Sequence, residues 1–463
     1  MHDSGRSLPV RIAYVGGGSL NWAMALMSDL AFDRRLKAHV CLYDIDHDAA
    51  KRNAEIGARY ADVSHGVPAT YEACEALQEA LTGADIVVIS ILPGAFADMA
   101  QDIEIPARYG VPQAVGDTVG PGGFLRALRA IPMMAQIANA IKDHAPDAFV
   151  CNLTNPMSVL TDTIYQVFPT VKAWGECHEV TKIRTQVAWI ANQAAGYDVF
   201  DHRDVLVNVL GINHFTFVDA IFLDDHDMLP AYKRFVADHA ATGWAQSETR
   251  DPEKARYFGS CNLVAFDMLG RFGVAGAAGD RHLAEFLPVA DYLADPEDWG
   301  FALTPVDYRI RDREARIKRA EDMRSGKAPV EAKRSDEALT DQIAAVMGGG
   351  SFVSNVNLPN RGQLEGLPQG AIVETNAVFD NQGVRPLPAG RLPEALEAIV
   401  VDHASRQTAL VAAVLAEDRA ALFPLFRSDP LVRHLGGEDA RRMYDEMVMA
   451  TAKLIPEALR GAG

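Results

Sequence analysis

A glycine cluster between a strand pattern and a helix pattern is the feature that most constrains the fold of this chain. Residues 10–30 read VRIAYVGGGSLNWAMALMSDL, in which an apolar run enters three consecutive glycines. After the glycines, Trp22, Leu26 and Leu30 recur about one helical turn apart, as on the apolar face of a helix. A strand that turns directly into a helix leaves free N–H groups beside the turn, where an anion can bind. The opening therefore predicts a strand–turn–helix unit with an anion site.

Strand and helix patterns then alternate up to about residue 195. Further strands are predicted within residues 38–46, 84–96 and 148–156, with helical segments between them. The helix predicted over 124–144 contains Pro132, which we expect to kink or restart it. Strands that alternate with helices form parallel sheets, so this part of the chain predicts an α/β fold.

Beyond about residue 195 this alternation stops. The later segments predict a β-hairpin, a charged surface helix, a group of strands with turn signals and two closing helices, over residues 204–225, 311–342, 351–387, 394–422 and 437–459. We therefore predict two domains, residues 1–195 and residues 196–463, of which the second is a mixed α+β domain.

Composition excludes several classes of partner. With 44 Lys and Arg against 62 Asp and Glu, the net charge is −18, which repels nucleic acid and anionic membranes. Five cysteines without a paired framework suit a reducing cytoplasm. There is no apolar secretory signal, and no apolar run approaches the roughly 20 residues of a membrane span. We expect a cytoplasmic protein with a small-molecule partner and without a nucleic-acid or membrane partner.

The glycine cluster and the acid that follows it fit a dinucleotide site. Gly16 and Gly18 occupy the first two glycine positions of G-x-G-x-x-G, whereas the third is Asn21. Asp44 ends the next strand, where an acid binds the adenosine ribose and favours NAD over NADP. A plain glycine-rich turn is the alternative. Asp46 competes with Asp44 for the ribose-binding role, and its other interpretation is a helix cap. The further nucleotide contacts that we expect are Ser19, Pro93 and Asn152.

Polar residues also gather where the later strands end. Asp117 lies just before a Gly-Pro-Gly-Gly loop, and Asn155 follows the strand near residue 150. Open α/β sheets bind ligands at this edge, so we expect both side chains to contact a substrate. A tight connection between helices explains the glycine-rich loop equally well.

Thiol and imidazole groups offer a metal site. Cys177 and His178 are adjacent in GECHEV, and His214 interrupts an apolar segment. A reduced Cys beside a His can be a nucleophile, a metal ligand or a small buried residue. A lone His in a strand is more often a hydrogen-bonded core residue. Together, Cys177 and His214 can hold a divalent metal and leave positions open for substrate oxygens.

These motifs together resemble glycoside hydrolase family 4, the NAD- and metal-dependent glycosidases. GGGSLNW, GDTVGPGGFLRALRAIP, NLTNP, GECHEV and GINHF occur in the family's order over nearly the whole chain. The resemblance implies a Rossmann-like N-terminal domain similar to that of lactate and malate dehydrogenases. It also implies two cofactors, NAD and Mn²⁺ or another divalent metal on Cys177 and His214, in a homodimer or homotetramer.

The residues after the cysteine indicate the substrate. Cys-His-Glu-Val resembles the α-galacturonidase group, which implies an α-linked galacturonide. α-Glucuronides and α-galactosides are the alternatives within the family. A 2-hydroxy acid dehydrogenase, or a protein that senses sugar or NAD without turnover, is the alternative from another class.

The resemblance also implies a mechanism of C3 oxidation, C2 proton removal, loss of the leaving group and addition of water. Some members use a Tyr as the base; at the corresponding place this chain offers Asp280, which we predict to be the base, with His178 as the acid. For the substrate carboxylate we predict Arg281 with His282 assisting, and Arg361 is the alternative. An ordinary helix start would explain the polar cluster around Asp280 as well.

Overall fold

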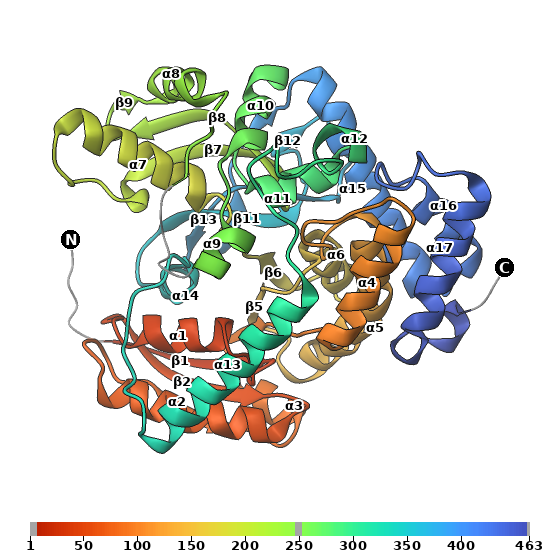
Figure 1. Cartoon of the computed structure of the whole chain (residues 1–463). Helices are drawn as coiled ribbons and strands as arrows, with labels where there is room; N and C mark the ends of the chain where they lie inside the picture. The colour runs from red at the N-terminus through yellow and green to blue at the C-terminus, as the bar shows by residue number, and fades with distance from the viewer. Residues whose placement is uncertain (1–6, 246–251, 461–463) are drawn as a thin grey trace.

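The computed structural model describes residues 7–245 and 252–460, and its centre is a nine-stranded sheet (Figure 1). The strand order is β14-β13-β11-β6-β5-β4-β1-β2-β3. The first six strands are parallel, and their order 3-2-1-4-5-6 is that of dinucleotide-binding sheets, which confirms the predicted α/β, Rossmann-like fold. They are β1 (Leu8–Val15), β2 (Leu36–Tyr43), β3 (Thr70–Ala73), β4 (Ile86–Ile89), β5 (Phe149–Asn152) and β6 (Lys172–Gly175).

The helices that alternate with these strands include one that differs from the prediction. They are α1 (Trp22–Leu30), α2 (His47–Asp62), α3 (Leu77–Leu81), α4 (Phe96–Arg108), α5 (Gly120–His144), α6 (Met157–Val167) and α7 (Thr181–Ala195). The Gly-Pro-Gly-Gly segment is the first turn of α5 rather than a loop before it, because a proline is well tolerated there. Pro132 lies inside α5 without ending it, since the lost hydrogen bond is outweighed by the packing of this largely buried helix.

Three strands from the C-terminal half continue the main sheet. β11 (Phe352–Pro359) pairs antiparallel with β6 through Asn357 and Gly175, and β13 (Ile372–Asp380) and β14 (Gly383–Pro386) follow. The sequence predicted strands here but assigned them to the second domain, because alternating hydrophobicity does not identify the pairing partner. They cover an edge of β6 that would otherwise expose unpaired backbone groups. The boundary between residues 195 and 196 stays a prediction, with one sheet shared across it.

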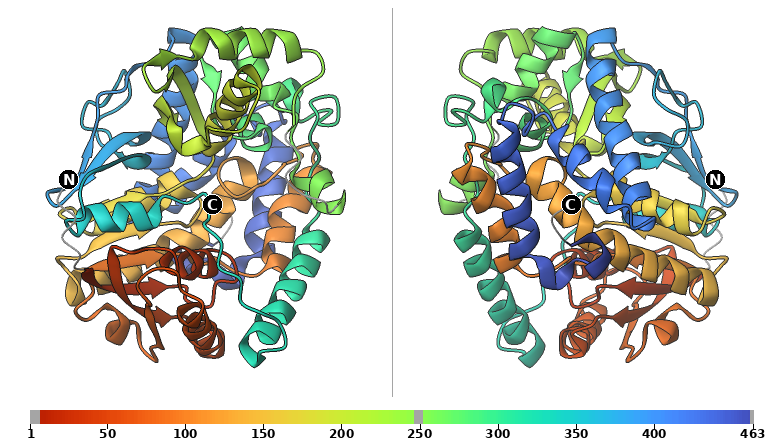
Figure 2. Two further views of the ribbon diagram at one scale, coloured as in Figure 1. Left: turned by 90° about the vertical axis from the view of Figure 1, so that its left-hand side faces the viewer. Right: turned by 90° about the vertical axis from the view of Figure 1, so that its right-hand side faces the viewer.

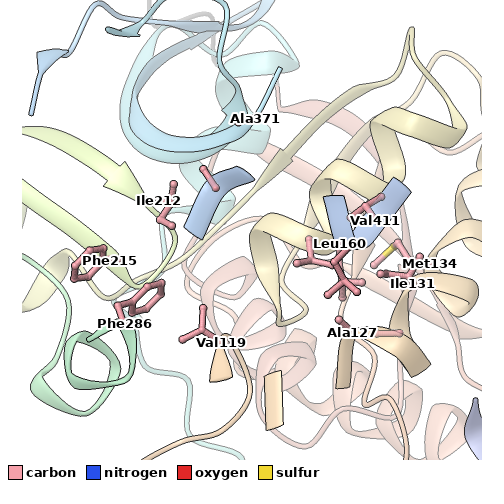
Figure 3. Packing of buried hydrophobic residues seen from close by; sticks show 14 of the residues in the cluster. Val119, Ala127, Ile131, Met134, Leu160, Ile212, Phe215, Phe286, Ala371 and Val411 are labelled. Atoms are coloured by element: carbon pink, nitrogen blue, oxygen red, sulfur yellow. The ribbon is translucent and has the colours of Figure 1, made fainter. Parts of the chain in front are cut away.

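The predicted hairpin is confirmed and builds a second sheet. It consists of β7 (Val205–Ile212) and β8 (Phe215–Leu223), with β9 (His226–Asp227) and β10 (Ala275–Gly276) beside β8. Its two-residue turn ends in His214, whose φ of 65° is uncommon for a non-glycine residue. Phe215 stacks on Phe286 with ring centroids 4.6 Å apart, in the core shown in Figure 3. This packing fixes the turn that carries His214.

The remaining elements lie in the C-terminal half. The helices are α8 (Leu229–His239), α9 (Pro252–Phe258), α10 (Leu263–Phe272), α11 (Asp280–Leu283), α12 (Val289–Tyr292), α13 (Val306–Ser325), α14 (Leu339–Val346), α15 (Glu394–Leu415), α16 (Arg419–Arg427) and α17 (Gly437–Ala450). The short elements are the 3-10 helices η1 (His202–Asp204), η2 (Ala284–Phe286), η3 (Ala452–Leu454) and η4 (Glu457–Leu459), with the paired strands β12 (Leu364–Glu365) and β15 (Gly390–Arg391). The single helices predicted over 311–342 and 394–422 are each two helices, and the one predicted over 437–459 ends at Ala450. Gly326, with φ 79°, ends α13 in the left-handed region, a stop signal that the charged pattern hid.

Two helices connect the layers of the molecule. α13 runs along one side and packs on both α2 and α4 (Figure 2). α15 is long and apolar enough to cross a membrane by length and composition alone. However, it packs against α5, α6 and α16, and its Arg406 pairs with Asp429 at 2.9 Å. We therefore interpret α15 as a core helix.

A buried ion pair joins α4 and α5, and its removal should destabilise the fold. Arg129 donates to both oxygens of Asp102, at 2.8 and 2.6 Å, and both side chains are 1% exposed. Asp102→Asn leaves the guanidinium buried without a counter-charge, so the free energy of unfolding should fall by about 3–5 kcal/mol in a urea titration. As a control, Glu321→Gln breaks an exposed pair with Arg324 and should cost less than about 1 kcal/mol. Equal small losses in both variants would contradict this account.

Candidate functional site

The glycine turn has the close contacts expected of a nucleotide-binding turn. Gly16 has φ 93°, and a Cβ there would lie 2.0 Å from the carbonyl oxygen of Ser90, just after β4. The N–H of Gly18 donates to Asp44 Oδ2 at 2.9 Å, and a Cβ on Gly18 would lie 2.9 Å from the same oxygen. Neither position has room for a side chain. The structure thus brings the predicted ribose-binding acid to the turn itself.

The other predicted nucleotide contacts shape the neighbouring loops. Ser19 Oγ accepts a hydrogen bond from the first turn of α1, and the Pro93 carbonyl accepts one from α5. Asn152 is fully buried and bonds to the backbone of Thr154 in its own loop. Asp46 caps α2, which is the alternative role predicted for it. All of these loops follow the carboxyl ends of parallel strands, and their contact with a nucleotide stays a prediction.

Three potential metal ligands meet beside the same edge of the sheet. One ligand atom from each of Asp117, His214 and His282 lies within 4.8 Å of the other two, and the imidazole centroids are 3.7 Å apart. Thr118 donates its hydroxyl proton to Asp117 Oδ1 at 2.7 Å, so its oxygen accepts from His214 Nδ1 at 2.8 Å. In this tautomer the proton is on Nδ1, so the lone pair of His214 Nε2 is free for a cation. The sequence singled out His214 as a ligand and Asp117 and His282 as substrate contacts.

Burial sets the protonation of this group. It lowers the pKa of His214 and, more strongly, the pKa of His282. Burial also raises the pKa of Asp117, but interactions with His282 and Arg126 outweigh that effect, and the pKa lies below its ordinary value. Ionised carboxylate and neutral imidazole are the forms that bind metals. Oxygen and imidazole donors suit Mn²⁺ among other divalent ions, so these residues fit the metal that the sequence implied.

Asn155 joins this group from the loop after β5. Its Nδ2 donates to Asp117 Oδ2 at 3.4 Å, and its carbonyl accepts from Arg126 Nε at 2.9 Å. Its buried Oδ1 has no hydrogen-bond partner within residues 7–245 and 252–460. That oxygen can accept from a substrate hydroxyl, in keeping with the predicted role.

The segment after β6 lines the same edge. Cys177 is buried, and burial raises the pKa of its thiol, so a nearby cation is needed to ionise it. Its sulfur is outside the three-residue group above, and its role as a ligand stays a prediction. His178 Nδ1 lies 3.3 Å from Glu337 Oε1, and its ring lies 5.5 Å from that of Trp22, the first residue of α1. His178 therefore lies against the start of the helix that follows the glycine turn.

Glu179 and Glu374 fix the loops of this site, and sequence reasoning missed both. Glu179 accepts from Lys182 Nζ at 2.8 Å and from the N–H of Gly279 at 2.7 Å, and so ties the segment after β6 to the loop before His282. Glu374 accepts from Asn213, next to His214, and from two asparagines of β11. Burial raises the pKa of Glu374 to about 7. The asparagines in SNVNLPN were the available signal, because buried amides need partners.

The structure favours a structural role for Asp280 rather than the predicted role of base. Its side chain is fully buried, Oδ1 accepts from the N–H of Ala265 at 3.0 Å, and Oδ2 accepts from Ser260 Oγ at 2.7 Å. Burial raises its pKa to about 6, which would suit a base. Both oxygens, however, hold the start of α10, as a capping carboxylate does. A sequence pattern does not show which way such a carboxylate points.

A second group of potential ligands lies away from the strand ends. His39, Cys41 and Glu72 are neighbours on β2 and β3, with ligand atoms within 4.8 Å of one another. Glu72 is occupied by His39 at 2.9 Å and Arg11 at 3.4 Å. These contacts explain why the three side chains lie together, and no bound metal is needed to explain it.

Comparison with known proteins identifies the family. The model of the family 4 glycosyl hydrolases matches residues 11–193, and that of their C-terminal domain matches residues 209–432. The chain belongs to family 4 of the glycosyl hydrolases. An α-galacturonidase of Thermoanaerobacter italicus is 43% identical over 95% of each chain, and one of Bacillus subtilis is 44% identical over 95% of this chain and 97% of the other.

Solved structures agree with this membership. A putative glucosidase of Bacillus subtilis superposes with a TM-score of 0.90 at 44% identity, covering 95% of this chain and all of the other. A 6-phospho-α-glucosidase from gut microorganisms, solved in complex with NAD and Mn²⁺, has a TM-score of 0.80 at 20% identity and covers 98% and 100% of the two chains. The latter likeness is one of fold.

Measurements of Mn²⁺ binding should separate the roles of His214 and His282. His214→Ala removes the nitrogen that faces away from Thr118 and should weaken Mn²⁺ binding by about 100-fold or more in a calorimetric titration. We expect His214 and not His282 to be the metal ligand. His282→Gln should therefore keep the Mn²⁺ affinity within about threefold. His226→Ala, in exposed β9, is the control and should bind like the wild type. Equal losses in the first two variants would make His282 a ligand as well.

Proposed function

We propose that this enzyme is an α-galacturonidase that hydrolyses α-linked galacturonides, with NAD and Mn²⁺ or another divalent metal as cofactors. The observation that carries the proposal is the meeting of Asp117, His214 and His282. Identities of 42–44% with four α-galacturonidases, over nearly the whole chain, support this substrate. The ring contact between Trp22 and His178 supports adjoining nucleotide and sugar sites.

The chain's own residues would hold both cofactors. The turn of Gly16 and Gly18, with Asp44, binds the nucleotide, and Ser19, Pro93 and Asn152 border it. Asp117, His214 and the predicted ligand Cys177 hold the metal. When bound, NAD accepts the C3 hydride and the metal polarises the sugar oxygens. Asn155 offers its unpartnered oxygen to a sugar hydroxyl.

His282, in place of Asp280, is the group to which we assign removal of the C2 proton. Its Nδ1 is buried and has no hydrogen-bond partner in the part of the chain that the structure describes. Its ring centroid lies 3.7 Å from that of His214, with the ring planes tilted by 32°, which puts an imidazole next to the group that holds the sugar oxygens. A positioned imidazole is the most frequent general base in enzymes. Asp280 ties α11, the helix that carries His282, to the start of α10.

His178 is the group to which we assign proton donation to the leaving group. Its side chain is 41% exposed, so it can reach an aglycone that extends toward solvent. Glu337 orients the ring through Nδ1, and Glu179 lies 3.9 Å from Nε2. The proton passes to the glycosidic oxygen as the C1–O bond breaks, and water then adds at C1.

The finer expectations from the sequence remain part of this proposal. They are a cytoplasmic location, a homodimer or homotetramer, and the absence of nucleic-acid and membrane partners. The substrate class itself, a small-molecule glycoside, follows from membership of the family.

Cofactor dependence tests the proposed function. Protein stripped of nucleotide and metal should release p-nitrophenol from p-nitrophenyl α-galacturonide at least about 100-fold more slowly than protein supplied with NAD⁺ and Mn²⁺. Each cofactor is omitted in turn, and the NADH absorbance is followed at the same time. Because the hydride returns to the sugar, NADH should not accumulate with product. Full activity without NAD⁺, or one NADH per substrate consumed, would contradict the proposal; the second result would indicate a dehydrogenase.

A further inference from the structure

Two arginines lie beside the site, Arg281 buried and Arg309 half-buried, and neither contacts a carboxylate in the part of the chain that the structure describes. Arg281 begins α11 with Asp280, and Arg309 lies in the first turn of α13. Within residues 7–245 and 252–460, neither guanidinium forms a salt bridge, and the Nε atoms of both are buried without a hydrogen-bond partner. Arg281 Nη2 bonds to the carbonyl oxygen of Ala114 at 2.5 Å and to the hydroxyl of Thr304, which are neutral acceptors.

The two guanidinium groups share one aromatic ring. Arg281 Cζ lies 5.2 Å and Arg309 Cζ lies 5.9 Å from the ring centroid of Phe258, the last residue of α9. A cation over an aromatic face is stabilised by the ring, and a planar guanidinium fits this geometry well. Phe258 therefore holds two positive groups from separate helices at one place.

The charges at this place are not balanced by the nearby acids. Burial lowers the pKa of Arg281 to about 10, and the charge of Arg309 is the next cause; burial likewise lowers the pKa of Arg309. The charge of Glu285 raises the pKa of both arginines without contacting either of them. Its Oε1 instead accepts from the N–H groups of Val115 and Gly116. Asp117 is bound to Thr118 and Asn155. A buried cation and a half-buried one side by side, both with a buried and unpartnered Nε, are costly unless a ligand supplies an anion.

We propose that Arg281 and Arg309 together bind the C6 carboxylate of the substrate, on Phe258 as a shared support. This inference rests on the proposed function and adds Arg309 and Phe258 to the predicted Arg281. It also frees His282 for the proton at C2. A sugar whose O2 and O3 face Asp117 and His214 directs its C6 to the opposite side of the ring, and Arg281 is adjacent in sequence to His282. Planar guanidinium groups match a carboxylate with two parallel hydrogen bonds.

Substitution of Arg309 tests this inference more cleanly than substitution of Arg281, which also bonds to the backbone of Ala114. Arg309→Met keeps an unbranched, flexible side chain and removes the charge, so kcat/KM for p-nitrophenyl α-galacturonide should fall by about 100-fold. For p-nitrophenyl α-galactoside, which has no carboxylate, the fall should be under about fivefold. Arg309→Lys keeps the charge but loses the planar, two-pronged guanidinium. Its kcat/KM for the galacturonide should lie between those of the wild type and Arg309→Met. Arg313→Met, an exposed position one turn further along α13, is the matched control.

Binding measurements keep the test decisive if the neutral substrate is cleaved slowly. The inhibition constant of galacturonate should rise by about 100-fold in Arg309→Met, whereas that of galactose should stay within about fivefold. The dissociation constant of NAD⁺ should not change; a marked rise would assign Arg309 to the cofactor phosphates and overturn the inference. Equal losses for charged and neutral sugars, or no loss for either, would overturn it too. If the wild type itself cleaves no galacturonide, the proposed function fails, which is a separate result.

Discussion

A chain of hydrogen bonds from Asp117 through Thr118 to His214 is the interaction on which the rest of the site depends. It joins the loop between α4 and α5, in the half of the chain that forms the parallel strands, to the tip of the hairpin in the second sheet. The direction of these bonds fixes the tautomer of His214 and the direction of its free nitrogen. The left-handed backbone of His214 and the stacking of Phe215 on Phe286 keep that tip in place. Strain of this kind persists only where the surrounding packing determines the conformation.

Burial of polar groups explains why the site is built from several loops. Three parallel strands, β1, β5 and β6, end at one edge and supply the glycine turn, the segment of Asn152 and Asn155 and the segment of Cys177. Each of these short loops brings a few polar groups, and none could satisfy them alone. Glu179 and Glu374 complete the hydrogen bonds between loops. Among the buried polar atoms that remain unpartnered in the described residues are those of Asn155, His282 and the two arginines, which the proposal assigns to the substrate.

Local signals in the sequence predicted much of the fold and part of the site. The glycine turn, Asp44 and the hairpin follow from spacing within about thirty residues. Hydrophobic periodicity predicts structure well over segments of this length. The pairing of β11 with β6 joins Asn357 to Gly175, a contact between distant segments that no local pattern encodes. The same limit explains why the sequence predicted neither the contacts of Asp280 with the start of α10 nor the position of Arg309. The contacts of these two side chains depend on how α9, α10 and α13 meet in space. Neither charge nor position in the sequence shows this.

The most direct test of the account follows the hydrogen at C2 of the sugar. The wild-type enzyme, with NAD⁺ and Mn²⁺, hydrolyses p-nitrophenyl α-galacturonide in D₂O, and the galacturonic acid is analysed by proton NMR and mass spectrometry after partial conversion. If a base removes the C2 proton during cleavage, the product carries deuterium at C2, whereas free galacturonic acid incubated without enzyme does not. Product that retains its original hydrogen at C2 would indicate direct displacement at C1 and would contradict the account.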